Sequence, residues 1–425
     1  MRIIFYVAVT LVAALVTWGF SVLILRLSHR YRLYPQQIRS RDVHTTPTPR
    51  LGGVAMFFGV VVAVAVAWML PQLRPVFGDS VQIITILIAA LLIVVLGVID
   101  DLWDLGWITK LSGQFIVGGI LAFGGTQIQS LPVGGITLLS PLQSLILTIF
   151  AVVLVMNAVN FIDGLDGLVA GVAIIANGVF FVYTYEQQSA NNLDYYNLAA
   201  LITAVLIGAC IGFLPVNFHP ARMFMGDAGA LLVGLLMAVS AICVTGVIDP
   251  RNIQTGRLDH GDLVGAFIPI LLPFAILVIP LLDFGLAVMR RLRAGKSPFS
   301  ADRKHLHHRL LDMGHSHLHA VLIFYAWTAV ASIGLLTFLF IPWWWSLVVL
   351  GVGFAATAAF TLAPLTRRKR AEVVAQKTKV VDQVDPVDVA KLDPLDAATD
   401  HTEPGVVPAD ADRTLMRLNK KEAST

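Results

Sequence analysis

Charged residues are scarce in this sequence. Asp, Glu, Lys and Arg make up 13% of its 425 residues, whereas 57% of the residues are hydrophobic. Soluble domains carry about 25% charged residues. Apolar runs recur along the chain, and many reach the length of roughly 18 or more residues that a helix needs to cross a bilayer core. Because a helix satisfies its own backbone hydrogen bonds in lipid, the sequence predicts an all-α polytopic membrane protein.

Cysteine is almost absent, and no signal peptide is recognisable. Cys210 and Cys243 both lie within apolar runs, so a disulfide framework is not expected. The first apolar run, residues 3–25, is longer than a signal-peptide core of about 7–15 residues, and no convincing cleavage site follows it. It is therefore predicted to be the first membrane span.

Hydropathy predicts about eleven transmembrane helices. They cover residues 3–25, 52–70, 81–99, 111–124, 141–159, 168–185, 198–214, 228–248, 263–289, 320–340 and 346–365. Pro269, Pro273 and Pro280 should kink or break the ninth. The connecting loops contain 14 Lys and Arg on one side and 3 on the other. By the positive-inside rule the N-terminus lies outside and the C-terminus in the cytoplasm, with the plasma (inner) membrane as the expected location.

The last part of the chain has a different composition. After the basic run 367–370, residues 371–425 contain no aromatic residue and are rich in Asp, Lys, Ala, Val and Pro. Such a segment cannot bury enough apolar surface to order itself. The sequence therefore predicts a membrane domain over 1–366 and a disordered cytoplasmic tail over 367–425, whose basic run contacts anionic lipid. A partner-binding tail is the alternative.

Five polar segments fall on the predicted cytoplasmic side. They are RDVHTTPTPRLGG (41–53), IDDLWDLGWITK (99–110), NFIDGLDG (160–167), NFHPARMFMGDAGA (217–230) and SPFSADRKHLHHRL (297–310). The loops on the opposite side contain nothing comparable. This one-sided distribution predicts an active-site cleft at the cytoplasmic face.

The carboxylates in these segments need a polar environment. Together they would cost roughly 15–21 kcal/mol deep in lipid; they are Asp100, Asp101, Asp104, Asp163, Asp166 and Asp227. They must lie at the membrane rim, in a wet cleft or around a cation. Hard oxygen ligands suit Mg²⁺ or Mn²⁺, and Mg²⁺ commonly bridges carboxylates to the phosphates of a substrate.

Each segment also has a simpler interpretation. In NAVNFIDGLDGLVAG, Asn157 and Asn160 are helix neighbours, and the Asp-Gly pairs could serve only as turns. Asp227 could simply cap a helix. The histidine-rich segment suits phosphate binding better than zinc, because basic residues accompany the histidines and no cysteine does; a solvated basic face is the other possibility. Asp283 could pair with a basic neighbour or line the cleft.

These motifs, in this order, resemble the polyprenyl-phosphate N-acetylhexosamine-1-phosphate transferase family. The matching residues are NAVNFIDGLDGL, FMGDAGA, the Asp-Asp pair and DRKHLHHRL, and the resemblance covers residues 1–365. PRLGG and HLHH are closer to the WecA/TagO type than to the MraY branch. Four motifs in register are far more specific than any one of them.

The resemblance implies roles for the acidic and amide residues. Asp227 would be the principal metal ligand, with Asn160 and Asp100 beside it. Asp100, Asp101 and Asp163 would be the catalytic carboxylates.

The resemblance also implies a set of substrate-binding residues. Asp166, Asn217 and Phe224 would hold uridine, and the others would contact sugar or phosphates; these others are Lys110, His305, His307, His308, Arg303, His44 and Arg50. Asp42 departs from the basic residue that many relatives have before the His44 region, which leaves the role of that loop open.

The implied activity is transfer of GlcNAc-1-phosphate from UDP-GlcNAc to undecaprenyl or decaprenyl phosphate, with Mg²⁺ or Mn²⁺ as cofactor. The products would be polyprenyl-pyrophosphoryl-GlcNAc and UMP, in the first membrane step of a cell-envelope polysaccharide. A single displacement is favoured over a covalent aspartyl-phosphate, because a phosphate monoester is already an adequate nucleophile. The expected partners are these substrates and membrane lipid, not nucleic acid, and a homodimer is left open. The rivals are a phospho-MurNAc-pentapeptide transferase of the same family and an ion-coupled transporter.

Overall fold

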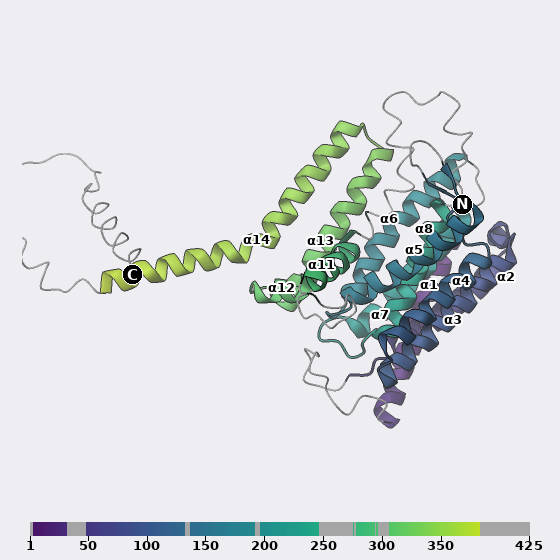
Figure 1. Ribbon diagram of the computed structural model, residues 1–425, viewed down its shortest axis with the longest axis horizontal. Helices are drawn as coiled ribbons and strands as arrows, with labels where there is room; N and C mark the ends of the chain where they lie inside the picture. The colour runs from purple at the N-terminus through teal and green to yellow at the C-terminus, as the bar shows by residue number, and fades with distance from the viewer. Residues whose placement is uncertain are drawn as a thin grey trace, which may run out of the picture. The chain divides into compact units, whose positions relative to one another are not determined.

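The computed structural model describes residues 3–31, 48–131, 137–191, 196–245, 275, 278–293, 295 and 306–382. The chain divides into two units, Met1–Leu365 and Thr366–Thr425. Helices lying side by side make up nearly all of the described part of the first unit (Figure 1), so the prediction of an all-α polytopic membrane protein is confirmed. The described ranges also contain a two-stranded antiparallel hairpin, in which Leu131 of β1 (Ser130–Leu131) pairs with Thr137 of β2 (Thr137–Leu138).

The described helices correspond closely to the predicted spans. They are α1 (Ile3–Tyr31), α2 (Gly52–Met69), α3 (Ser80–Trp103), α4 (Trp107–Phe123), α5 (Pro141–Ile162), α6 (Leu168–Asn191), α7 (Tyr196–Asn217), α8 (Gly226–Thr245), α11 (Val278–Arg293), α12 (Leu306–Asp312), α13 (His317–Leu336) and α14 (Trp343–Asp382), with 3-10 helices at Pro71–Phe77 and Thr337–Leu339. Within the described ranges, 9 helices are long and apolar enough to cross a membrane, and α4 is a shorter apolar helix. Most of the predicted ninth span lies outside the described residues.

Several helices begin at side-chain caps that the sequence supplies. Ser140 and Gln143 form a capping box at the start of α5, where Pro141 occupies the first turn. Asp79 accepts a hydrogen bond from the backbone nitrogen of Gln82 at the start of α3. These caps satisfy backbone donors that the first turn of a helix leaves without partners.

Two predicted boundaries are wrong in a way that matters. Helix α3 continues to Trp103, so Asp100 and Asp101 lie in its last turn and not in the loop after it. Asp104, with a left-handed φ of 53°, is the C-cap residue that follows. Helix α14 continues to Asp382, so a helix occupies the first part of the predicted disordered tail. A hydropathy pattern predicts the end of a span at the first charged residues. The helix itself continues for as long as its backbone hydrogen bonds continue. The disorder predicted for 383–425 falls outside the described residues.

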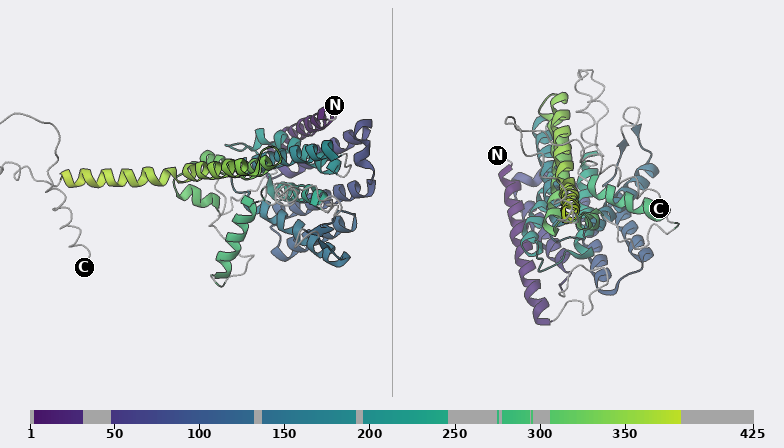
Figure 2. Two further views of the ribbon diagram at one scale, coloured as in Figure 1. Left: turned by 90° about the horizontal axis from the view of Figure 1, so that it is seen from above. Right: turned by 90° about the vertical axis from the view of Figure 1, so that its left-hand side faces the viewer.

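Helix α8 lies at the centre of the bundle and carries Asp227 in its first turn. It packs against α2, α3, α5 and α7. In the right-hand view of Figure 2, the purple helix α1 runs along one side of the bundle. A Cβ atom on Gly53 of α2 would lie 2.2 Å from the backbone nitrogen of Gly229, and one on Gly97 of α3 would lie 2.3 Å from the Cα of Ala228. The backbones therefore approach so closely at Gly53 and Gly97 that only glycine fits there. Small residues allow the start of α2 and the last part of α3 to lie directly against the start of α8.

Asn157 ties α5 to α4. Its side-chain Nδ2 donates to Oε1 of Gln114 on α4 at 2.5 Å and to the carbonyl of Val153 at 2.8 Å. Gln114 is fully buried. A paired amide bridge of this kind satisfies polar groups within an apolar bundle, so Asn157 serves packing, whereas Asn160 faces the site.

Replacing Asn157 by leucine should lower the stability of the solubilised protein by about 1–2 kcal/mol, because the buried Gln114 amide loses its partner. The double variant with Gln114→Leu should be more stable than the sum of the two single losses predicts, since neither polar group then remains buried alone. Thermal unfolding of the four proteins measures this coupling. Additive losses in the double variant would show that the two amides do not act as a pair.

Candidate active site

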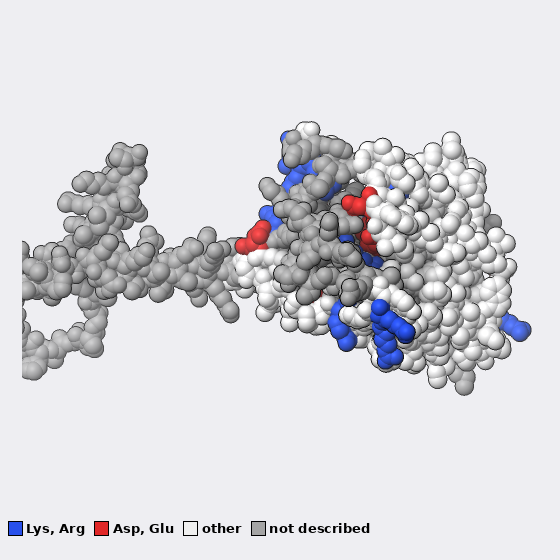
Figure 3. All heavy atoms as spheres, turned by 90° about the horizontal axis from the view of Figure 1, so that it is seen from below, with Lys and Arg blue, Asp and Glu red and all other residues white. Residues whose placement is uncertain are grey.

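Three of the predicted polar segments, 99–110, 160–167 and 217–230, meet at one end of the described helix bundle. Asp100 comes from the last turn of α3, Lys110 from the start of α4, Asn160 from the end of α5 and Asp227 from the first turn of α8. On the face shown in Figure 3, acidic and basic side chains lie near one another on one part of the described surface. Much of the remaining described surface in view carries neither.

The ammonium group of Lys110 lies at the centre of this cluster. Its Nζ is 3.0 Å from Oδ2 of Asp100 and contacts Oδ2 of Asp227. It also donates to Oδ1 of Asn160 at 3.5 Å, while Nδ2 of Asn160 donates to Oδ1 of Asp227 at 2.9 Å. The remaining oxygen of Asp100, Oδ1, accepts from the backbone of Leu105 at 2.8 Å, which fixes the carboxylate. Oxygen atoms from three helices thus surround one positive charge.

The segment before α2 closes one side of the cluster. Its backbone pairs with the loop before α8: Phe224 N donates to the carbonyl of Pro49 at 2.9 Å, and Gly52 N donates to the carbonyl of Phe224 at 3.1 Å. Gly226 adopts φ of 70°, and a Cβ there would lie 2.5 Å from both the Arg50 carbonyl and Asp101 Oδ2. The pairing brings Arg50 next to the carboxylates, and Asp101 accepts from the backbone nitrogen of Ala228 at 3.4 Å.

Asp163 lies in the turn between α5 and α6, and its surroundings favour the protonated form. Burial first, then the nearby charges of Asp227 and Asp101, raise the pKa of its carboxyl to about 8, although Arg50 opposes the shift. A cation near Asp163 would lower this pKa again, because positive charge stabilises the carboxylate. Asp163 therefore stays protonated to a higher pH than a free aspartate does.

The raised pKa of Asp163 gives a testable pH dependence. Between its unfolded pKa near 4 and its folded value of about 8 the folded protein binds more protons than the unfolded chain. Its contribution to stability is therefore lost as pH rises through this window. In EDTA, the melting temperature should fall more steeply with pH from 6 to 9 in the wild type than in Asp163→Asn. Parallel curves would contradict the assignment.

A second group of polar contacts joins the turn before α6 to the loop before α8. Asn217 accepts at Oδ1 from the backbone nitrogen of Gly167 at 3.0 Å and donates from Nδ2 to the carbonyl of Met223 at 3.0 Å. Asp166 is buried, and its Oδ2 is 2.8 Å from Nδ1 of His219. These contacts bring Asp166, in the turn before α6, close to Asn217, the last residue of α7.

The histidine-rich segment is described only in part. His44, Arg303 and His305 lie outside the described residues; His307 and His308 belong to α12, but their side chains are not described. Asp283, whose role the sequence left open, is fully buried on α11, and its Oδ1 accepts from the backbone nitrogen of Leu306 at 2.9 Å. It therefore anchors the beginning of α12.

The donor set of the first cluster fits a hard divalent cation. Within the described ranges, no three His, Cys, Asp or Glu residues form a metal-binding group. Mg²⁺, however, is usually held by one or two carboxylates, water and substrate phosphates. Asp100, Asp227 and the amide oxygen of Asn160 already surround the Lys110 ammonium, so the same oxygens could hold a metal ion. The roles of the individual site residues stay predictions.

Two residues of this region were not predicted. His219 lies within the NFHPAR part of a recognised motif, so its position in the sequence was a usable signal. Tyr325 lies within an apolar span and gives no signal, yet its hydroxyl donates to the carbonyl of Gly167 at 2.6 Å. A Cβ on Gly171 would lie 2.0 Å from the Tyr325 hydroxyl oxygen, so this glycine makes room for the contact.

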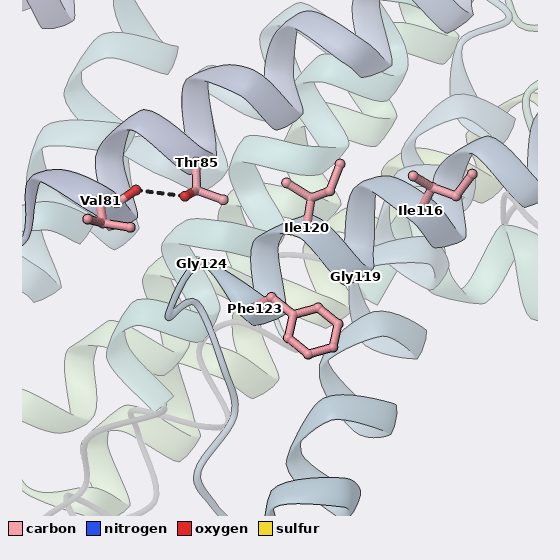
Figure 4. A pocket seen from close by; sticks show the side chains of 7 residues that line it. All are labelled: Val81, Thr85, Ile116, Gly119, Ile120, Phe123 and Gly124. Atoms are coloured by element: carbon pink, nitrogen blue, oxygen red, sulfur yellow. Dashed lines mark hydrogen bonds between the residues drawn. The ribbon is translucent and has the colours of Figure 1, made fainter.

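An apolar pocket of about 530 Å³ lies between α3 and α4 (Figure 4), lined by Val81, Thr85, Ile116, Gly119, Ile120, Phe123 and Gly124. The hydroxyl of Thr85 donates to the carbonyl of Val81 at 2.7 Å. The residues of α4 and its C-cap that line the pocket follow Lys110 by 6 to 14 residues, or about 9 to 21 Å along the helix at 1.5 Å per residue. The pocket is separate from the polar cluster.

The fold and the cluster define a polytopic membrane protein with a charged site at one end of its bundle. Residues 83–245 match the model of glycosyl transferase family 4. The chain is 40% identical over 369 residues to the decaprenyl-phosphate N-acetylglucosaminephosphotransferase of Mycolicibacterium smegmatis, covering 85% of this chain and 88% of that protein. It is 30% identical over 355 residues to the undecaprenyl-phosphate alpha-N-acetylglucosaminyl 1-phosphate transferase of Yersinia pestis, covering 80% and 88%.

A relative from the other branch is covered less fully. The phospho-N-acetylmuramoyl-pentapeptide-transferase of Desulforudis audaxviator is 30% identical over 256 residues, which span 54% of this chain and 74% of that protein. The chain belongs to the polyprenyl-phosphate N-acetylhexosamine-1-phosphate transferase family, of the WecA/TagO type.

Proposed function

We propose that the protein transfers GlcNAc-1-phosphate from UDP-GlcNAc to a polyprenyl phosphate and releases UMP. The observation that carries this proposal is that Asp100, Asn160 and Asp227 converge on one positive charge, the ammonium group of Lys110, at the end of the bundle. The mycobacterial relative, named for a decaprenyl phosphate and for N-acetylglucosamine, supports the choice of substrates. The enzyme is a multi-pass membrane phosphotransferase, and we infer that its site faces the cytoplasm, where the positive-inside rule puts this end of the bundle.

In the proposed reaction an oxygen of the polyprenyl phosphate attacks the β-phosphorus of UDP-GlcNAc. The bond from this phosphorus to the bridging oxygen breaks, and UMP leaves with the electron pair. Lys110 and Arg50 would orient and neutralise phosphate oxygens, so that charge developing on the pyrophosphate is met by groups already in place. Asp166, Asn217 and Phe224 would hold the uridine.

Mg²⁺ or Mn²⁺ would be held by Asp227, Asp100 and Asn160. When bound, such an ion supplies electrostatic stabilisation of the phosphoryl oxygens. In that state Lys110 would be displaced from the centre of the carboxylates and become available to a phosphate. His305, His307, His308 and Arg303 remain proposed contacts for sugar and pyrophosphate, and His44 a proposed contact in the first loop.

Two rivals make different predictions. The phospho-MurNAc-pentapeptide transferase is less well supported, because its relative matches a smaller share of the chain at lower identity than the mycobacterial one. A transporter would place ionisable groups near mid-membrane and on both sides, whereas the carboxylates of the described cluster gather at one end of the bundle.

The direct test uses the purified full chain in liposomes with labelled UDP-GlcNAc, decaprenyl phosphate and Mg²⁺. We expect label in the lipid fraction and an equal amount of UMP. UDP-MurNAc-pentapeptide and other UDP-sugars serve as competing donors. Transfer from the pentapeptide donor alone, or no UMP from any donor, would overturn the proposal. Omitting Mg²⁺ in EDTA and restoring it tests the cofactor.

A further inference from the structure

His219 occupies an unusual position beside the second polar group. It lies in the loop between α7 and α8, two residues after Asn217. Its side chain is 44% exposed, whereas that of Asp166, which it contacts, is 4% exposed. The imidazole is therefore the exposed member of a contact whose other member, the carboxylate, is nearly buried.

Two donors hold one oxygen of this carboxylate. Oδ2 of Asp166 accepts from Nδ1 of His219 at 2.8 Å and from the backbone nitrogen of Ala221 at 3.1 Å. Two hydrogen bonds that converge on a single oxygen fix the rotation of the carboxylate plane. Asn217 then links the same loop to Gly167, the neighbour of Asp166. Hydrogen bonds thus join the two loops, and His219 is a side chain that helps to set the orientation of Asp166.

The imidazole is itself held in place from α13. The ring of His317, in the first turn of that helix, lies parallel to the ring of His219, with centroids 5.5 Å apart and an interplanar angle of 2°. His317 follows the cap residue Ser316, which accepts from the backbone nitrogen of His319. The start of α13 therefore fixes the plane of the ring that orients Asp166.

We propose that His219 is a positioning residue for recognition of the nucleotide base of the UDP-sugar. The inference rests on the proposed function, in which Asp166 and Asn217 hold the uridine. A uracil ring offers an imide N–H donor, and a carboxylate accepts it well only in a defined plane, because hydrogen bonds weaken steeply with angle. By fixing that plane, His219 prepares the site for a pyrimidine base without contacting the reacting phosphates.

Three variants separate the hydrogen bond from the stacking. His219→Phe keeps a flat ring to lie on His317 but has no donor; His219→Asn keeps a donor near the position of Nδ1 but has no ring; His219→Ala has neither. The Phe and Ala variants should bind UDP, and use UDP-GlcNAc, with a dissociation constant and a KM raised about tenfold. Their kcat and their KM for decaprenyl phosphate should stay within about twofold of wild type. The Asn variant should recover most of the UDP affinity.

UDP binding by calorimetry and steady-state kinetics give separate readouts. Wild-type UDP affinity in His219→Phe would overturn the inference, as would equal losses of kcat, both KM values and thermal stability in all three variants, since these indicate a structural role alone. If the wild type binds UDP but transfers no sugar phosphate, the proposed function fails, while the variants still decide the role of His219. A wild type that does not bind UDP would overturn both.

Discussion

Replacement of Asp227 by asparagine should reduce GlcNAc-1-phosphate transfer by about a hundredfold to a thousandfold, the range for loss of a preorganised electrostatic group. Both carboxylate oxygens are engaged: Oδ1 accepts from Asn160, and Oδ2 contacts Lys110. An amide keeps the size of the side chain but removes the charge at the point where four helices converge. Residual activity should require more Mg²⁺, because a neutral oxygen binds a hard cation less well.

Asp104→Asn is the matched control for this variant. It makes the same substitution at an exposed residue beside the acidic pair, and asparagine tolerates the left-handed backbone with φ of 53° found there. Its activity should remain near that of wild type. Release of UMP at several Mg²⁺ concentrations measures both effects, with elution of a monodisperse peak as the folding check. A folded Asp227→Asn protein with wild-type turnover would refute the assignment of Asp227.

Removing the ammonium of Lys110 should destabilise the metal-free protein and abolish most of its activity. In Lys110→Met the carboxylates of Asp100 and Asp227 lose the positive charge between them. Loss of one partner costs about 3–5 kcal/mol in a fully buried pair, and this partly buried cluster should lose less. Transfer should fall about a hundredfold, because the same group is proposed to bind phosphate. Lys110→Arg keeps the charge with a different geometry and should retain more stability than activity.

The Lys110 variant also gives a specific signature with Mg²⁺. Without its internal cation, the carboxylate cluster should bind Mg²⁺ more tightly than in the wild type. By linkage, the ion should then raise the melting temperature of Lys110→Met more than that of the wild type. Melting curves in EDTA and in increasing Mg²⁺ measure the difference. Equal metal-induced shifts in the two proteins would contradict competition between Lys110 and the ion.

The sequence predicted the architecture and the assembly of the site better than its internal contacts. Long apolar runs separated by short polar segments determine how many helices form, and they alternate the ends at which those segments emerge. This is why Asp100, Asn160 and Asp227 could be expected at one end of the bundle before any contact was known. The exact ends were harder to predict, because α3 carries its two adjacent acidic residues within its last turn.

Side-chain pairing depends on helix rotation, which the sequence does not display. Lys110 and Asp227 are 117 residues apart, and only the packing of α4 and α8 around α3 and α5 brings them together. Asn157 and Asn160 looked equivalent in the same motif, yet one faces Gln114 and the other faces Asp227. Residues three apart on a helix point in directions that differ by about 60°. This difference is enough for Asn157 to pack against another helix while Asn160 faces the polar cluster.

The enclosure of α8 has a mechanical consequence. Of the 18-residue hydrophobic stretch of α8, 89% is buried inside the protein, whereas the same share is 22% for α1 and 11% for α14. Changes in bilayer thickness act on helices through their lipid-facing surfaces and are absorbed by tilting. Helices α1 and α14 should therefore tilt when the bilayer thickness changes. Helix α8, which carries Asp227, should keep its position. We expect turnover to vary little among liposomes made from short-chain and long-chain phospholipids.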